Sequence, residues 1–158
     1  MKPTPNGWPR ISSALVYDDA RKAIDWLCKA FGFEVRLLVE SKDGELVHDE
    51  LVLGDGVIMI AQSGKRPHFK SPSAAGGGNT QTLMVYVDDV EAHLANARKH
   101  GAKIFQELET TDYGPEYWSD RTYGAIDLEG HHWWFVQRLK TGNERWSEVR
   151  NKIDKSDH

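Results

Sequence analysis

The chain has 158 residues, of which 39% are hydrophobic and 28% charged, and its formal net charge is −4. A chain of this length can bury enough apolar surface to fold without disulfides, its acidic balance argues against a nucleic-acid-binding surface, and no apolar run reaches the roughly 20 residues of a membrane span. The single cysteine, Cys28, and a first segment without the apolar stretch of a secretion signal predict a cytoplasmic protein.

An extension, residues 1–10, precedes a first module that spans residues 11–62. This module opens with a strand predicted over residues 12–17. Asp18-Asp19 comes next, and carboxylates there cap the free N–H groups at the start of a helix. The helix should end at Gly32, because glycine suits the left-handed position beyond a helix end. Residues at helical spacing form its apolar face: Ala20, Ala23, Ile24, Leu27, Cys28 and Phe31.

Three strands should follow this helix. Apolar and polar residues alternate over residues 34–40, which predicts a strand exposed on one side. Asp43-Gly44 is a hairpin turn signal, and residues 46–53 form the next predicted strand. Gly54-Asp55-Gly56 turns the chain again, before a short buried strand over residues 57–61. The order of the module is therefore βαβββ.

The connection that follows, residues 63–81, is rich in Gly, Ser, Pro and Lys and contains Gly76-Gly77-Gly78. This composition predicts a flexible crossover. A lid that closes over a cavity is the alternative.

A second module, residues 82–138, repeats the order of the first. Its strand over residues 82–87 leads to Asp88-Asp89, a helix and Gly101. Strands are predicted at residues 103–108, 119–126 and 132–137. A tail, residues 139–158, carries an apolar stripe of Trp146, Val149 and Ile153 at helical spacing. Such a short helix needs a packing partner, either the body of the chain or a second subunit.

Several stretches carry a family resemblance, and they extend from about Ile11 to Arg138. These stretches are Val16-Tyr17-Asp18-Asp19-Ala20, Ala30-Phe31-Gly32-Phe33, Val47-His48-Asp49-Glu50-Leu51, Gly54-Asp55-Gly56-Val57-Ile58-Met59, Tyr117-Trp118-Ser119-Asp120-Arg121, Tyr123-Gly124 and Asp127-Leu128-Glu129-Gly130-His131. Together with the repeated βαβββ order, they resemble the vicinal oxygen chelate superfamily of glyoxalases, bleomycin-resistance proteins and extradiol dioxygenases. Leu128 departs from the proline usual there. The resemblance implies an α+β fold of two tandem βαβββ modules, whose curved mixed sheets form a cup-shaped cavity for a small molecule.

The resemblance also implies where metal-dependent members place their ligands, on the first and last strand of each module. The matching positions here are Ser12, Met59, Thr82 and Trp134. None is a usual ligand of zinc, nickel, manganese or iron, and an alignment slip of one position offers only Gln81. We therefore expect no metal and no cofactor, as in a bleomycin-resistance-like branch without metal ligands.

Trp134 is predicted on the cavity face of its strand together with His132 and Val136. Its ring would fill the place of an ion and could stack against an aromatic or cationic ligand. A core tryptophan is the alternative.

His48 and Glu50 lie two residues apart on a strand and so share a face. They are the candidates for an acid–base pair, with a weak surface ion pair as the alternative.

Arg121 and Tyr123 also share a face, near Trp118. We expect these three residues to contribute to ligand binding, since an arginine can hold a carboxylate or phosphate with two hydrogen bonds. A structural ion pair of Arg121 with Asp120 or Asp127 is equally open. His93 and His100 are expected at the surface.

Three functions remain open. The first is a metal-free protein that binds and sequesters a small molecule, as in drug resistance. The second is an enzyme, glyoxalase-, lyase- or dioxygenase-like, that uses a metal at other ligands or acid–base chemistry at His48 and Glu50. The third is a partner-binding module whose cup is filled by side chains. The resemblance implies a homodimer, and neither nucleic acid nor membrane is an expected partner.

Overall fold

The computed structural model describes residues 1–142, and this part of the chain contains two helices and eight strands. Their order confirms the βαβββ module that the sequence predicts twice. The apolar stripe predicted in the tail lies outside the described residues. In chain order the elements are β1 (Ser13–Tyr17), α1 (Ala20–Phe31), β2 (Glu34–Glu40), β3 (Leu46–Leu53), β4 (Gly56–Gln62), β5 (Leu83–Tyr86), α2 (Val90–Lys99), β6 (Lys103–Asp112), β7 (Ser119–Ile126) and β8 (His132–Lys140).

Both helices begin and end as the sequence predicts. The Asp19 carboxylate accepts a 3.0 Å hydrogen bond from the Lys22 N–H. Asp89 caps α2 in the same way, through the N–H of Ala92 at 3.0 Å. Gly32 and Gly101 take the left-handed conformation, with φ of 78° and 85°, which costs glycine little.

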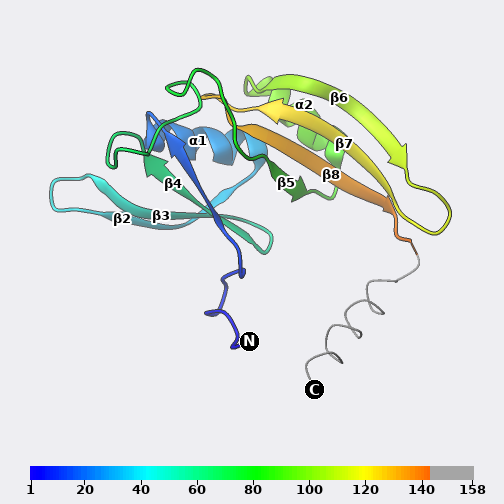
Figure 1. The fold of residues 1–158 in the computed structure, drawn as a ribbon, viewed down its shortest axis with the longest axis horizontal. Helices are drawn as coiled ribbons and strands as arrows, with labels where there is room; N and C mark the ends of the chain where they lie inside the picture. The colour runs from blue at the N-terminus through cyan, green and yellow to red at the C-terminus, as the bar shows by residue number, and fades with distance from the viewer. Residues whose placement is uncertain (143–158) are drawn as a thin grey trace.

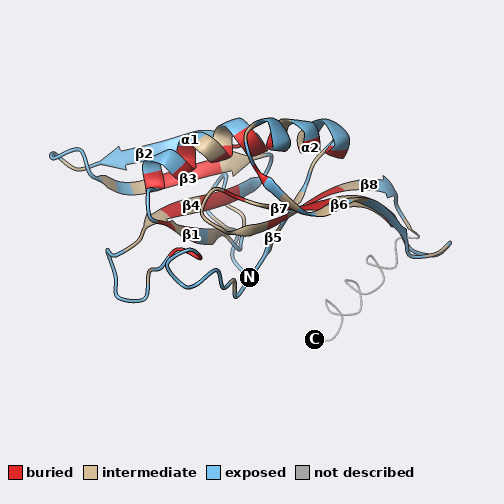
Figure 2. Cartoon of the chain, turned by 90° about the horizontal axis from the view of Figure 1, so that it is seen from above, coloured by how far each residue is buried: buried red, intermediate tan, exposed pale blue. Residues whose placement is uncertain are grey.

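The strands form two four-stranded mixed sheets, ordered β1-β4-β3-β2 and β5-β8-β7-β6. In each sheet the first and last strands of the module pair in parallel, and the other pairs are antiparallel. Figure 1 shows the two sheets side by side. Both helices lie on the same side of the strands and contact each other (Figure 2). Each sheet therefore has a helix-covered face and an opposite, concave face.

One hydrophobic core joins the two modules. Phe31, at the end of α1, packs its ring 5.4 Å from Trp133 and 4.7 Å from Phe135, both on β8. All three side chains are fully buried. Because aromatic rings contribute a large share of buried area, these contacts fix the first helix against the second sheet.

Polar groups of the turn between β7 and β8 also bind the first module. The Asp127 carboxylate accepts hydrogen bonds from the Tyr17 hydroxyl at 2.6 Å and from the Trp133 indole N–H at 3.0 Å. The Glu129 carboxylate accepts from the backbone N–H groups of Asp18 and Asp19, where α1 begins. The second module thus supplies part of the cap of the first helix.

The connection between the modules is held to both of them. Ser71 and Pro72 are buried. The Ser71 hydroxyl donates to Asp18 at 2.9 Å, and the Ser73 hydroxyl donates to the Glu129 carbonyl at 2.8 Å. These contacts explain why the middle of this Gly-rich segment follows a defined path.

Two sequence expectations need correction. All seven residues of β2 are exposed, whereas the alternation predicted one buried face. The strand is the outer edge of its sheet, and α1 makes its larger contact with β4. The concave faces are also not closed into a cup within one chain: the cavity described below is an open groove.

None of the described helices is long and apolar enough to span a membrane.

Candidate ligand-binding groove

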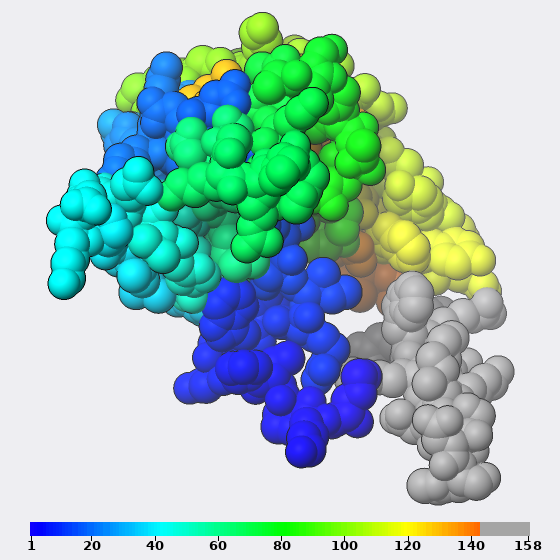
Figure 3. All heavy atoms as spheres, turned by 60° about the vertical axis from the view of Figure 1, so that its left-hand side comes forward, coloured from blue at the N-terminus to red at the C-terminus, as the bar shows by residue number. Residues whose placement is uncertain are grey.

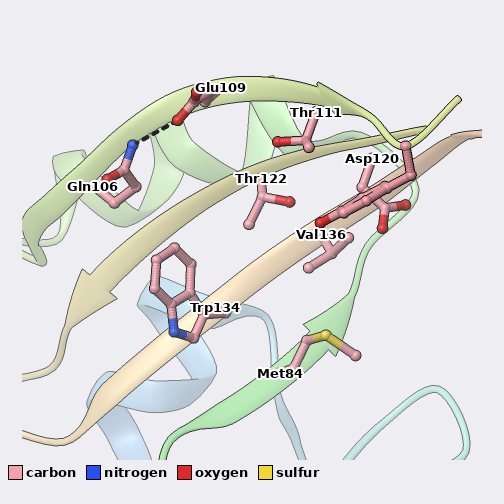
Figure 4. Close-up of a pocket in the computed structure, with 9 residues that line it drawn as sticks. Met84, Gln106, Glu109, Thr111, Asp120, Thr122, Trp134 and Val136 are labelled. Carbon is pink, nitrogen blue, oxygen red and sulfur yellow. Dashed lines mark hydrogen bonds between the residues drawn. The ribbon is translucent and has the colours of Figure 1, made fainter. Parts of the chain in front are cut away.

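The concave face of the second sheet carries a groove of about 370 Å³. Figure 4 shows its side chains projecting from β5, β6, β7 and β8. This volume falls within the range of small-molecule sites. The lining residues are Met84, Gln106, Glu109, Thr111, Tyr113, Asp120, Thr122, Trp134 and Val136.

Strand register explains why these side chains converge. Met84 on β5 lies opposite Trp134 on β8, and Thr122 on β7 lies opposite Val136. Residues paired across neighbouring strands point to the same face of a sheet. The parallel β5–β8 pair therefore sets the thioether of Met84 next to the indole of Trp134.

A glycine makes room for an aromatic wall, formed by the rings of Trp134 and Phe105. Gly124 lies opposite Trp134, and a Cβ at that position would meet the Phe105 ring at 2.4 Å. The ring covers this gap, with its centroid 5.0 Å from Trp134 and 4.9 Å from the His132 ring, on which it stacks. Phe105 remains 40% exposed, so the wall also presents ring surface to solvent.

The charges in the groove differ in how far they are neutralised. Asp120 accepts a 2.5 Å hydrogen bond from Arg138, which also donates to the Tyr86 hydroxyl at 2.6 Å. The Asp120 carboxylate raises the pKa of Arg138 by bonding to its charged form. Glu109, in contrast, makes no ion pair within residues 1–142 and accepts only a 3.2 Å hydrogen bond from the Gln106 amide. Its carboxylate can therefore meet a cation in the groove.

Only some of the predicted ligand-binding residues lie at the groove. Trp134 lines the groove, and His132 joins it through the Phe105 ring. Trp118 lies outside the lining, beside Tyr113 at a ring distance of 5.2 Å.

Arg121 and Tyr123 lie on the opposite face, so their placement in the cavity needs correction. Arg121 forms an ion pair with Glu91 of α2 at 2.6 Å, and Tyr123 is fully buried. Tyr123 bonds through its hydroxyl to His93 Nδ1 at 2.6 Å. Both side chains contact α2, because this helix covers that face of β7.

His93 is likewise not a surface residue. Its Nε2 bonds to the Phe31 carbonyl at 3.0 Å, and its ring lies 4.2 Å from Phe135. Burial lowers its pKa, because the charged imidazolium loses solvation. The side chain therefore links the two modules as a neutral ring. His100 is part-buried and bonds to the Asn96 carbonyl at 3.0 Å.

His48 and Glu50 come together on the concave face of the first sheet. Glu50 Oε1 bonds to His48 Nε2 at 3.0 Å, and Glu50 Oε2 accepts from Arg36 at 2.6 Å. These hydrogen bonds, that of His48 foremost, lower the pKa of Glu50. Both oxygens of this buried carboxylate are thus occupied, which opposes a role as general base.

Arg36 ties this pair to the N-terminal extension. Its guanidinium donates to the Gly7 carbonyl and lies 4.8 Å from the centre of the Trp8 ring. Residues 4–9 line a hollow with Val52 and Val57 on the same side of the sheet. The extension therefore covers part of the first concave face, whereas the groove of the second stays open.

The four positions that would hold a metal in the resembling enzymes do not fit one. Met59 lies opposite Ala14, and Trp134 lies opposite Met84. The Ser12 hydroxyl is buried without a hydrogen-bond partner in the described part of the chain. Thioether and indole groups are poor ligands for the metals of this fold, and within residues 1–142 no three His, Cys, Asp or Glu side chains gather as a metal site would require.

Sequence reasoning missed the groove residues Glu109 and Asp120, together with Phe105 and Arg138, which contact the lining residues Trp134 and Asp120. The period-two rule applied from Trp134 through Val136 reaches Arg138, so this residue was within reach. The β6 residues were not, because two register shifts interrupt its pairing with β7 between Ile104 and Glu109. Such bulges change which residues face the groove.

Comparison with known proteins places the chain in a family. The profile of the Glyoxalase/Bleomycin resistance protein/Dioxygenase superfamily matches residues 10–135. An uncharacterized protein of Mycobacterium bovis is 33% identical over 142 residues, which cover 85% of this chain and 87% of the relative.

Solved structures agree. TioX from Micromonospora sp. ML1 is 32% identical, with a TM-score of 0.63 over 82% of this chain and 95% of TioX. TnmS3, an antibiotic binding protein from Streptomyces sp. CB03234, is 18% identical, with a TM-score of 0.60 over 80% of this chain and 93% of TnmS3, and shows the shared fold alone. From the profile match and the two βαβββ modules together, we conclude that the chain belongs to the Glyoxalase/Bleomycin resistance protein/Dioxygenase superfamily.

Proposed function

We propose that this protein binds and sequesters a small planar cation in the groove of its second sheet, without a metal. The observation that carries the proposal is that Trp134, whose ring packs against Phe105, and the carboxylate of Glu109 line one groove. Aromatic faces and a carboxylate both attract a delocalised cation. TnmS3, which has the same fold and binds an antibiotic, supports a binding role.

The polar groups of the groove favour binding over catalysis. Asp120 is neutralised by Arg138, so it is poorly placed to accept a proton from a substrate. Thr111 and Thr122 offer hydroxyl groups that can orient a ligand. The groove thus combines shape, a stacking surface and, within residues 1–142, a carboxylate without an ion pair, which suits capture.

An enzyme of the superfamily is the second candidate, because His48 and Glu50 do meet at 3.0 Å on the first concave face. Metal analysis of the purified protein separates the two proposals. Zinc, nickel, manganese or iron at one ion per chain would favour the enzyme. The binding protein is expected to contain none of them in stoichiometric amount.

A homodimer is part of the proposal. Met84 and Tyr86 border the open groove and are 61% and 50% exposed, and Leu37 and Val39 are exposed on the first concave face. Exposed apolar side chains on a sheet face are candidates for an interaction surface. A second copy that covers both faces would close the groove, and light scattering after size exclusion should give twice the mass of the chain.

Calorimetric titration of the full-length protein with 9-aminoacridine, a planar cation, tests the proposed ligand class. We expect saturable binding that Trp134→Ala abolishes and Glu109→Gln weakens about tenfold, as for loss of a charged partner. Glu107→Gln is the matched control, since Glu107 lies on the same strand but pairs with Arg98. Equal binding of acridine-9-carboxylate, or equal affinities of the two glutamate variants, would contradict the proposal.

A further inference from the structure

A second pocket, away from the groove, lies between β1 and the connection of the two modules. It has a volume of about 330 Å³. Its walls include Ala14 and Val16 of β1, the turn residue His131, and residues of the 68–81 segment. In Figure 3 this green segment lies against the blue residues of the first module.

The lining of this pocket contains a cation and no anion. Lys70, His68 and His131 line it, and no aspartate or glutamate does. This is unusual in a chain whose formal net charge is −4. Lys70 forms no ion pair or hydrogen bond within residues 1–142, so its ammonium group has no partner in the described part of the chain.

Two acidic residues that contact this segment, Asp18 and Glu129, are already engaged. Asp18 accepts the Ser71 hydroxyl at 2.9 Å. Glu129 accepts the backbone N–H groups at the start of α1. Neither of them forms an ion pair with Lys70 in the described part of the chain.

The backbone adds donors to the same pocket. Gly76 and Gly77 have φ of 71° and 84°, and the N–H groups of the next three residues, Gly78, Asn79 and Thr80, bond to no acceptor in the described part of the chain. All three residues line the pocket. Each backbone N–H is a strong hydrogen-bond donor, so these three groups can donate to an anion that enters the pocket.

The segment that carries these donors is fixed in place. The Asn79 amide donates to the Gly130 carbonyl at 2.8 Å, and the Gly77 N–H donates to the Pro72 carbonyl at 2.7 Å. His131 is held by a 2.8 Å hydrogen bond to the Val16 carbonyl. A ligand would therefore meet preformed donors and lose little affinity to ordering.

We propose that this pocket is a binding site for a small anion, the phosphate or carboxylate group of a metabolite, separate from the groove of the second sheet. Lys70 supplies the charge, and the free N–H groups of residues 78–80 supply the hydrogen bonds. The pocket is large enough for the anionic end of a small molecule.

The test is a titration of the ¹⁵N-labelled full-length protein with inorganic phosphate, and separately with acetate, followed by NMR. We expect saturable shifts at Gly78, Asn79 and Thr80, and about tenfold weaker binding in Lys70→Gln, as for loss of a charge-assisted hydrogen bond. Lys42→Gln, in the turn between β2 and β3, is the matched control with the same charge change.

Sodium chloride at matched ionic strength separates binding from screening. Shifts with phosphate alone assign the site to phosphorylated ligands, and shifts with both anions assign it to anions in general. Shifts that chloride reproduces, or that Lys70→Gln leaves unchanged, overturn the proposal. Because the readout involves neither 9-aminoacridine nor Trp134, its outcome is independent of the proposed function.

Discussion

The hydroxyl of Tyr17 donates a 2.6 Å hydrogen bond to the carboxylate of Asp127, which lies 110 residues further along the chain. Tyr17 ends β1, and Asp127 follows β7, so the bond joins the first module to the second. Both residues are buried.

Tyr17→Phe should lower the free energy of unfolding by about 1–3 kcal/mol, because a buried carboxylate loses one of its donors. Urea denaturation measures the change. Tyr113→Phe is the control, since Tyr113 is 53% exposed and should cost almost nothing. An equal effect of both variants would show that the hydroxyl of Tyr17 contributes nothing specific.

The adjacent tryptophans of β8 should behave differently. Trp133→Ala removes a fully buried ring and should cost about 3–5 kcal/mol of stability. Trp134→Ala, on the groove face, should cost only about 1–2 kcal/mol, because the ring keeps part of its surface in water. Denaturation of both variants checks the assignment of faces, which a reversed order would contradict.

Gly124→Ala should displace the Phe105 ring, because the new Cβ would lie 2.4–2.9 Å from three of its atoms. The expected cost is about 1–3 kcal/mol for overpacking, together with weaker binding of 9-aminoacridine. In a Phe105→Ala background the same substitution should be nearly neutral. A double-mutant cycle without coupling between the two positions would rule out this contact.

Asp49→Asn should stabilise the protein at neutral pH. Burial raises the pKa of Asp49 above its ordinary value of 3.8, although its Oδ1 accepts the Ile60 N–H. Its other oxygen, Oδ2, lacks a partner within residues 1–142. The ionised form is therefore disfavoured in the folded state, and wild-type stability should rise as the pH falls from the raised pKa towards 3.8. The advantage of the variant should shrink over the same window in denaturation at several pH values.

Glu50→Gln should show the opposite sign. Hydrogen bonds from His48 and Arg36 lower the pKa of Glu50 below its ordinary value of 4.5. The ionised carboxylate thus contributes stability that is present above pH 4.5 and is lost as the pH falls through the lowered pKa. Relative to wild type, the variant should be less stable at neutral pH and converge with it in acid. Parallel pH profiles of the two proteins would argue against the role of these hydrogen bonds.

Much of the fold could be predicted because local chemistry and tertiary structure agree. Asp19 and Asp89 cap helices, and Gly32 and Gly101 end them, as residue type alone suggests. Because these signals occur twice, the sequence predicts two modules. Trp134 could be placed on the groove face because β8 alternates without interruption in its central part.

The face of β7 could not be predicted in the same way. The two faces of this strand are equally mixed in polarity: Arg121 and Tyr123 lie on one face, and Asp120 and Thr122 lie on the other. Contacts with α2 decide which face of β7 turns towards the helix: His93 bonds to Tyr123, and Glu91 pairs with Arg121. Such partners lie about thirty residues away in the chain and leave no local pattern.

The shared cap of α1 has a consequence for the history and engineering of this chain. Because Glu129 accepts the N–H groups of the two residues that precede a helix beginning at Ala20, the halves of this internal duplication have ceased to be interchangeable. A fragment that ends at Gln62 would leave the amide groups of Asp18 and Asp19, just before its helix, without this acceptor. Complementation from separately expressed halves should therefore succeed only when the second half carries that glutamate.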